Sequence, residues 1–166
     1  YDQSLDNIRA LLNPLHVTSF CLCDSLQQES YYHAEQVLVL SASSKTAIGM
    51  AQGLADDDGA PTIVGITSRA NYDFVQSLGC YREIVCYDEL DAINNSKPTV
   101  MVDMAGNRAV LGALHGPLGD NMLSCVSVGM THWETLADND PMAAQINRGR
   151  SSFFFAPAHV QKRIGD

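Results

Sequence analysis

Six short apolar segments recur along the chain and constrain its fold more than any other feature. Most of these segments are almost continuously apolar and lack the alternation of apolar and polar residues that a strand with one solvent-exposed face shows. Such segments are typical of a parallel sheet, because helices cover both faces of that sheet. We therefore predict strands over residues 37–40, 62–66, 83–87, 99–102, 122–128 and 152–155.

Amphipathic helical patterns separate most of these segments. Gly49 and Gly53 follow the first strand, and we expect them to let the helix there lie close to the sheet before Gly59 ends it. Further helices are predicted over 71–78, ending at Gly79, and over 107–115, ending at Gly116-Pro117. The apolar stripe of the first of these helices consists of Ala47, Ile48, Ala51, Leu54 and Ala55.

The regular order of strand, helix and strand predicts an α/β fold class. We expect a three-layer Rossmann fold with a doubly wound, six-stranded, mainly parallel sheet in the order 3-2-1-4-5-6. The 166 residues suit a single domain. Residues 1–35 are predicted to form a helical entry arm that Pro14 interrupts, with a second helical piece over 18–26, and residues 36–166 to form the Rossmann domain.

The charge balance and the cysteines exclude several classes of protein. Lys and Arg number 10 and Asp and Glu 19, which gives a net charge of −9, so we expect neither nucleic acid nor an acidic membrane surface as a partner. No apolar run reaches the roughly 18 residues of a membrane span. The five cysteines lack a C-x-x-C pair and zinc-finger spacing, which favours reduced core thiols, no metal site and a cytoplasmic location. The acidic run 56–58 is interpreted as a solvated surface turn.

The loop after the first strand is the expected ligand site, since ligands of doubly wound sheets bind beyond the carboxyl ends of the strands. Of the dinucleotide fingerprint G-x-G-x-x-G only the last glycine remains, as Gly49, with Ser43 and Thr46 at the other spaced positions. Small hydroxyl residues, helix-start amides and Lys45 suit a pyrophosphate. The alternative is that Ser43 or Ser44 only caps the helix. Both P-loop glycines are missing, which argues against nucleoside triphosphate hydrolysis.

The end of the second strand indicates which cofactor is preferred. NAD sites place an acid there to bind the ribose hydroxyls, whereas this chain has Ser68 and Arg69, which suit the 2′-phosphate of NADP(H). Tyr72 is a candidate to contact the adenosine phosphate. The alternative is that Arg69 is a solvated loop residue.

Several of these segments together resemble the nucleotide-binding domain of medium-chain dehydrogenase/reductases, in an uncharacterised, quinone-reductase-like branch. The similarity covers about residues 15–156 and rests on segments 37–42, 64–69, 77–80, 84–87, 102–106 and 126–129. It implies a pyrophosphate over 43–47, a 2′-phosphate at 68–69, and the ribose and nicotinamide beside the fourth and fifth strand ends. The cofactor-binding residues expected in total are Thr18, Ser43, Ser44, Lys45, Thr46, Ala47, Ser68, Arg69, Tyr72, Ala105, Gly106, Gly129 and Met130.

The resemblance implies an NADP(H)-binding domain of a zinc-independent oxidoreductase that reduces a carbonyl or enone. The barrel-like catalytic domain of that family is not in this sequence, so we expect a cofactor domain that is inactive alone. The alternative is a non-catalytic nucleotide-binding or assembly module. No catalytic residue is assigned: Asp103 is interpreted as an acid that bonds loop amides, and His132-Trp133-Glu134 as a packed tryptophan with polar neighbours. A homodimer through the last strand, 153–155, is the expected assembly.

Overall fold

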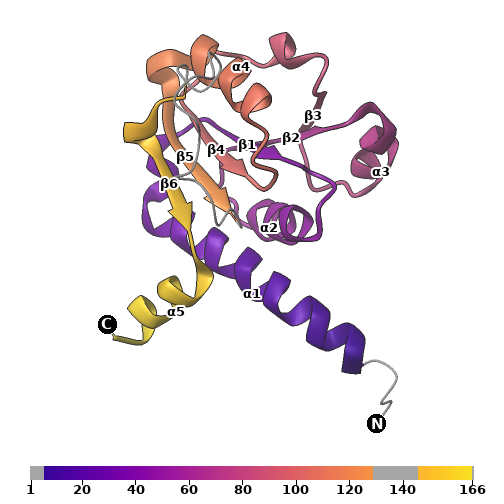
Figure 1. Cartoon of the computed structure of the whole chain (residues 1–166), viewed down its shortest axis with the longest axis vertical. Coiled ribbons are helices and arrows are strands. Elements are labelled where there is room, and N and C mark those ends of the chain that lie inside the picture. Colours follow the sequence, from indigo (N-terminus) through magenta and orange to yellow (C-terminus); the bar gives the residue numbers. More distant parts are fainter. Residues whose placement is uncertain (1–5, 129–145, 166) are drawn as a thin grey trace.

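Six strands form one all-parallel sheet in the order β3-β2-β1-β4-β5-β6 in the computed structural model of the chain (Figure 1). The structure describes residues 6–128 and 146–165, with side chains from residue 13. This is the three-layer α/β Rossmann-like fold that the sequence predicts, and all six predicted strands are confirmed. Their bounds are β1 Gln36–Leu40, β2 Thr62–Thr67, β3 Glu83–Cys86, β4 Thr99–Asp103, β5 Met122–Val128 and β6 Ser151–Phe154.

The central strands β1 and β4 are buried along their whole length, which explains why their sequences do not alternate. Their side chains point alternately to two separate cores. Val37 and Val39 pack on the face that α1 (Asp6–Gln28) and α2 (Lys45–Ala55) cover. Leu38 and Leu40 pack on the opposite face, beneath α4 (Arg108–Leu118). Two further helices are α3 (Tyr72–Ser77) and α5 (Ala156–Gly165).

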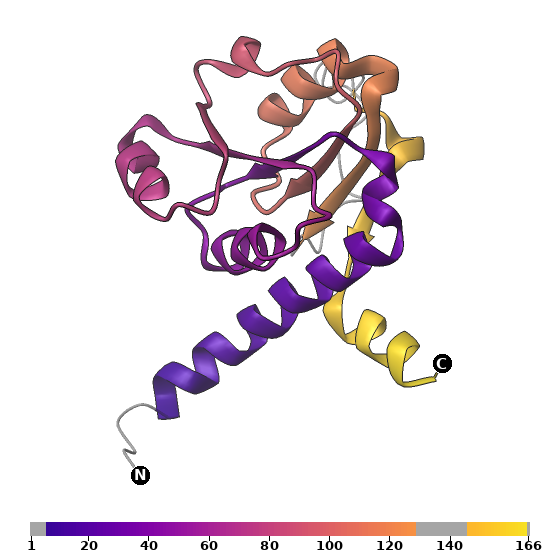
Figure 2. The same ribbon diagram turned by 180° about the vertical axis from the view of Figure 1, so that it is seen from behind.

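Helix α1 runs unbroken from Asp6 to Gln28 through Pro14, so the predicted interruption at Pro14 is wrong. Proline removes one backbone N–H donor, and the rest of the helix compensates for this loss. The Thr18 Oγ1 donates a hydrogen bond to the Pro14 carbonyl at 2.8 Å, and Leu22 and Leu26 bury the second half of α1 in the core. The first half of α1 extends away from the sheet in both views (Figures 1 and 2).

Gly49 and Gly53 face α1, which corrects the expectation that they approach the sheet. A Cβ atom on Gly49 would lie 2.7 Å from the Ser19 Oγ, and one on Gly53 would lie 3.0 Å from the Cys23 Sγ. The sheet side of α2 is instead formed by Ala47, Met50, Ala51 and Leu54, all fully buried, whereas the predicted stripe residue Ala55 is exposed. The glycines therefore set how close two parallel helices lie, and the Ser19 Oγ donates to the Thr46 carbonyl across that seam at 2.9 Å.

Two helix ends differ from the prediction. Helix α4 continues through Gly116-Pro117 to Leu118, because Leu118 is buried in the core and a proline in the last turn removes only one hydrogen bond. Helix α2 ends at Ala55, four residues before Gly59, with Asp56 as its C-cap. The helix predicted over 71–78 is confirmed as α3 within one residue at each end.

A left-handed turn, η2 (Ser30–His33), connects α1 to β1 and was not predicted. All four residues have positive φ angles, from 48° to 59°. Tyr31 is buried there and its hydroxyl donates to Asp57, which also accepts a bond from Gln27 Nε2 at 2.9 Å. Asp57 is therefore an anchor between α1 and the end of α2, and only Asp56 and Asp58 form the expected exposed turn.

All five cysteines are buried and carry free thiols, as predicted. Among the helices that the structure describes, none combines the length and the apolar character that crossing a membrane requires.

Candidate functional site

The strand order places the candidate site at the carboxyl edge of the sheet, between β1 and β4. From β1 the chain turns to α2 on one face, and from β4 it turns to α4 on the other. The two loops therefore diverge to opposite faces, and the place between them corresponds to the crevice where ligands of doubly wound sheets bind. Figure 1 shows β1 and β4 side by side in the middle of the sheet, between α2 and α4.

Two tyrosines hold the loop after β1 in its shape. Ser41 has a φ of 56°, a left-handed conformation that is uncommon without glycine, and its N–H donates to the Tyr87 Oη at 3.1 Å. The Tyr81 hydroxyl donates to the Ala42 carbonyl at 2.9 Å. The loop lacks the fingerprint glycines. Its turn is formed instead by the left-handed conformation of Ser41 and is held by side chains from the β3 region. Sequence analysis missed these supports because Tyr81 and Tyr87 are distant in sequence.

The loop leads directly into the amino terminus of α2. Ser44 is the N-cap, and its Oγ accepts a hydrogen bond from the Ala47 N–H at 3.3 Å, which confirms the capping interpretation for this residue. The amides of Lys45 and Thr46 lie in the first turn, where a helix offers no backbone partner, so this end can still attract an anion. The Lys45 side chain is exposed.

Ser43 links the β1 loop to the end of β2. Its Oγ accepts a hydrogen bond from Asn71 Nδ2 at 3.1 Å, and Asn71 closes the short turn η3 (Arg69–Asn71). Tyr72 begins α3 directly after this turn and is half-buried. The structure therefore brings the expected pyrophosphate loop and the expected ribose end together along one edge.

The end of β2 is less basic than its sequence indicates. The Nη2 atom of Arg69 lies 3.1 Å from the Asp88 Oδ2 and 2.8 Å from the Glu89 Oε1. Hydrogen bonds with Glu89 and Asp88 raise the pKa of Arg69 above its ordinary value, and the bond from Arg69 lowers the pKa of Asp88. Arg69 is therefore an exposed loop residue that is ion-paired to two carboxylates. Parallel pairing of β2 with β3 brings these acids beside Arg69, although they follow it by about twenty residues.

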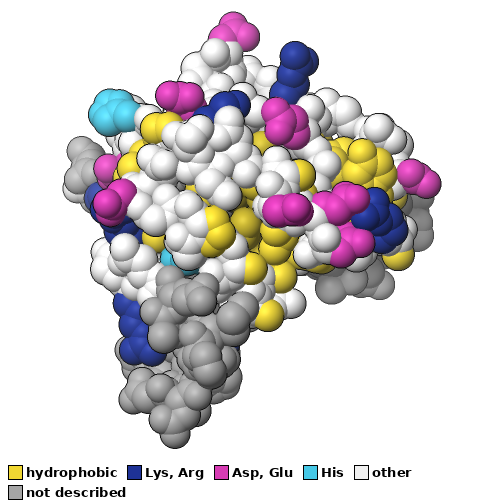
Figure 3. Space-filling view, turned by 90° about the horizontal axis from the view of Figure 1, so that it is seen from above, with side chains coloured by type: hydrophobic (Ala, Val, Ile, Leu, Met, Phe, Trp, Pro, Cys, Tyr) yellow, Lys and Arg dark blue, Asp and Glu magenta, His cyan; other side chains and the backbone are white. Residues whose placement is uncertain are grey.

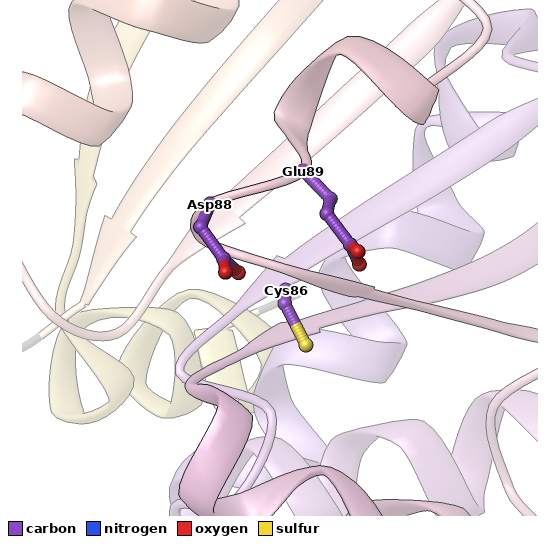
Figure 4. Close-up of side chains that lie close together, drawn as sticks. All are labelled: Cys86, Asp88 and Glu89. Atoms are coloured by element: carbon purple, nitrogen blue, oxygen red, sulfur yellow. The ribbon is translucent and has the colours of Figure 1, made fainter.

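Cys86 lies beside the same two carboxylates (Figure 4). One ligand atom from each of Cys86, Asp88 and Glu89 falls within 4.8 Å of the others, a spacing that a metal ion can bridge. The Arg69 guanidinium already supplies the positive charge that these carboxylates face. A metal ion would have to displace it, so this cluster is better described as an ion-pair network than as a metal centre.

The loop after β4 is organised by Asp103, which ends that strand and is almost fully buried. Its carboxylate accepts hydrogen bonds from the N–H groups of Ala105 at 2.9 Å and Gly106 at 3.0 Å, as predicted. Burial raises the pKa of Asp103, and these two bonds oppose the shift. Ala105 and Gly106 thus border the crevice with their amides already paired. Ser127 is the neighbour of Asp103 in β5, and its buried Oγ has no hydrogen-bond partner among the described residues.

The remaining expected site residues are Thr18, Ser68, Gly129 and Met130. The Thr18 hydroxyl is used within α1, on the Pro14 carbonyl, while the adjacent Ser19 contacts α2. Gly129 and Met130 lie outside the described residues, as do His132, Trp133 and Glu134. Ser68 precedes η3 as its N-cap without a side-chain capping bond.

Charged side chains are scattered over the face in Figure 3, where no continuous basic patch is visible. This agrees with the net charge of −9. The cations at the candidate site, Lys45 and Arg69, therefore act locally and do not belong to a broad positive surface.

Comparison with known proteins places the chain in one family. Among curated proteins nothing matches it. Over residues 1–166 the sequence matches the family described as "Protein of unknown function (DUF2855)". Because this match spans the whole chain, the protein belongs to the DUF2855 family.

Proposed function

We propose that this chain is the NADP(H)-binding domain of a zinc-independent, quinone-reductase-like oxidoreductase. The observation that carries the proposal is the position of the α2 amino terminus, with its Ser44 cap and its first-turn amides, at the switch point between β1 and β4. A helix end at this place in a Rossmann-like sheet is suited to a pyrophosphate. The resemblance to medium-chain dehydrogenase/reductases supports the same proposal from the sequence.

Three sets of residues at the carboxyl edge of the sheet suit three parts of a dinucleotide. The amides and side chains of Lys45 and Thr46 would bind the pyrophosphate, with Ser43 and Ala47 beside them. Ser68, Arg69 and Tyr72 would bind the adenosine ribose phosphate, and Ala105 and Gly106 would line the crevice on the side of β4. The bound cofactor supplies hydride transfer to a carbonyl or enone. The described residues of this chain would hold and orient it.

A second candidate, a non-catalytic nucleotide-binding or assembly module, is favoured by the use of site groups within the protein. The Ser43 and Ser44 hydroxyls accept internal hydrogen bonds, and the Arg69 guanidinium is paired with two carboxylates. These groups therefore keep their hydrogen-bond and ion-pair partners in a protein that binds no cofactor. An assembly module would have no affinity for NADP(H), whereas a non-catalytic nucleotide-binding module would bind the cofactor without supporting hydride transfer.

Calorimetric titration of the purified chain with NADPH and with NADH tests the proposal. We expect NADPH to bind, and Lys45→Ala to weaken it roughly tenfold, as expected when a charge-assisted hydrogen bond of about 1.5 kcal/mol is lost. Lys162→Ala removes an exposed lysine from α5 and is the matched control, with no expected change. Absence of binding of either cofactor at millimolar concentration would exclude the cofactor role and leave the assembly module.

The role of Arg69 is tested by substitution to alanine. Arg69→Ala removes the only guanidinium proposed to contact the 2′-phosphate, so it should weaken NADPH more than NADH. An equal effect on both cofactors would contradict this assignment.

A further inference from the structure

The Arg69 guanidinium is held at the one nitrogen atom that matters most for binding a phosphate. A guanidinium grips a phosphate with two parallel N–H bonds along either its Nε–Nη2 edge or its Nη1–Nη2 edge. Nη2 belongs to both edges, and both Asp88 and Glu89 contact this atom, at 3.1 and 2.8 Å. The hydrogen bond to Asp88 and the ion pair with Glu89 therefore compete with a phosphate for this atom.

The local charge also opposes a phosphate. Two carboxylates face one guanidinium, so the group of three carries an excess of negative charge. A 2′-phosphate that approached Arg69 would be repelled by Asp88 and Glu89, whereas a ribose hydroxyl could donate a hydrogen bond to either carboxylate.

The three side chains are more than half exposed, with fractions of 59% for Arg69, 66% for Asp88 and 52% for Glu89. Ion pairs with this exposure add little to folding stability, because water screens them. These charges therefore affect the binding of a ligand at this edge more than they affect folding, and their removal should leave the fold intact.

From these contacts we infer that Asp88 and Glu89 are specificity-determining residues of the cofactor site. They compete with the 2′-phosphate for Arg69 and accept hydrogen bonds from a 2′-hydroxyl, so they limit the preference for NADPH over NADH. This inference rests on the proposed function, and it assigns the selectivity to the loop after β3 as well as to the end of β2.

The test uses isosteric substitutions that remove the charges but keep the shapes. Asp88→Asn, Glu89→Gln and the double variant are titrated with NADPH and NADH, and the ratio of the two dissociation constants is compared with that of the unchanged protein. The double variant frees Nη2, so its ratio should shift toward NADPH by roughly tenfold, and each single variant by a smaller factor. Thermal unfolding should show a nearly unchanged Tm for all three.

The matched control is Asp91→Asn combined with Glu83→Gln. Both acids are exposed, lie on β3 or in the loop after it, and have no ion pair among the described residues, so this variant removes the same charge without touching Arg69. Its ratio should stay unchanged. An equal shift of the ratio in the control would show that the change follows from the lost net charge alone, and it would overturn the inference.

Two further results separate the inference from the proposed function. If the unchanged protein binds NADPH and the double variant keeps the same ratio, or shifts it toward NADH, the inference is wrong and the proposed function stands. If neither cofactor binds to the unchanged protein or to the double variant, both are wrong.

Discussion

Asp103 shows how one buried side chain shapes the crevice and makes stability depend on pH. Its carboxylate organises the β4 loop through the amides of Ala105 and Gly106. Burial raises its pKa in the folded protein, which means that the folded state holds the proton more tightly than the unfolded chain does. The contribution of this group to stability is therefore present at acidic pH, and it is lost as the pH rises from the unfolded pKa through the folded one.

The substitution Asp103→Asn tests the direction of this pH dependence. Asparagine keeps an oxygen that accepts from the loop amides but carries no charge, so the variant should gain stability relative to the original protein as the pH rises from 4 to 7. The measurement is the difference in Tm between the two proteins at each pH. If the Tm of Asp103→Asn relative to the original protein falls as the pH rises, the raised pKa of Asp103 is contradicted.

The seam between α1 and α2 determines how the helical arm is held against the sheet. The pair Gly49 and Gly53 faces the pair Ser19 and Cys23, four residues apart on each helix, so that small residues meet along two turns. Because Ser19 also bonds the Thr46 carbonyl, the seam reaches the first turn of α2 and thus the candidate site. Close packing here couples the position of α1 to the helix end that is proposed to bind the cofactor.

Gly49→Ala tests the seam. Alanine favours the helix by about 1 kcal/mol relative to glycine, yet its Cβ would lie 2.7 Å from the Ser19 Oγ, a clash whose relief costs about 1–3 kcal/mol. We expect a net destabilisation in urea unfolding, and partial recovery in Gly49→Ala with Ser19→Ala. Gly165→Ala, in α5 with open space around it, is the control and should not destabilise. A more stable Gly49→Ala protein would show that α1 and α2 can move apart with little loss of folding free energy.

Elements that depend on local burial could be predicted from the sequence, whereas contacts between distant segments could not. Strands β1 and β4 were recognisable because covering both faces leaves continuous apolar runs. The partners of Arg69 and Gly49 were not recognisable, because Asp88 and Ser19 reach them only through strand pairing and helix packing. The turn at Ser41 also escaped prediction, since the Tyr87 hydroxyl that supports it comes from the β3 side of the sheet.

At the scale of the whole molecule, the β6 end of the sheet carries exposed apolar side chains. Strand β6 is an edge strand, and Phe153 and Phe155 are 46% and 59% exposed beside it. Val17 and Phe20 are exposed on α1, which contacts α5 next to this edge. An apolar edge strand without cover tends to pair with another chain. This arrangement is the reason to test the homodimer that the sequence leads us to expect through the last strand.

Light scattering after size-exclusion chromatography tests the dimer. We expect a mass of twice the 18.0 kDa chain, and Phe153→Lys should return it to a monomer, because a lysine on the edge opposes strand pairing between chains. Phe74→Lys is the matched control, since Phe74 is 50% exposed on α3 at the other end of the sheet, and it should leave the mass unchanged. A monomer at all concentrations would refute the assembly. A dimer that Phe74→Lys dissociates and Phe153→Lys does not would move the interface to the β3 end.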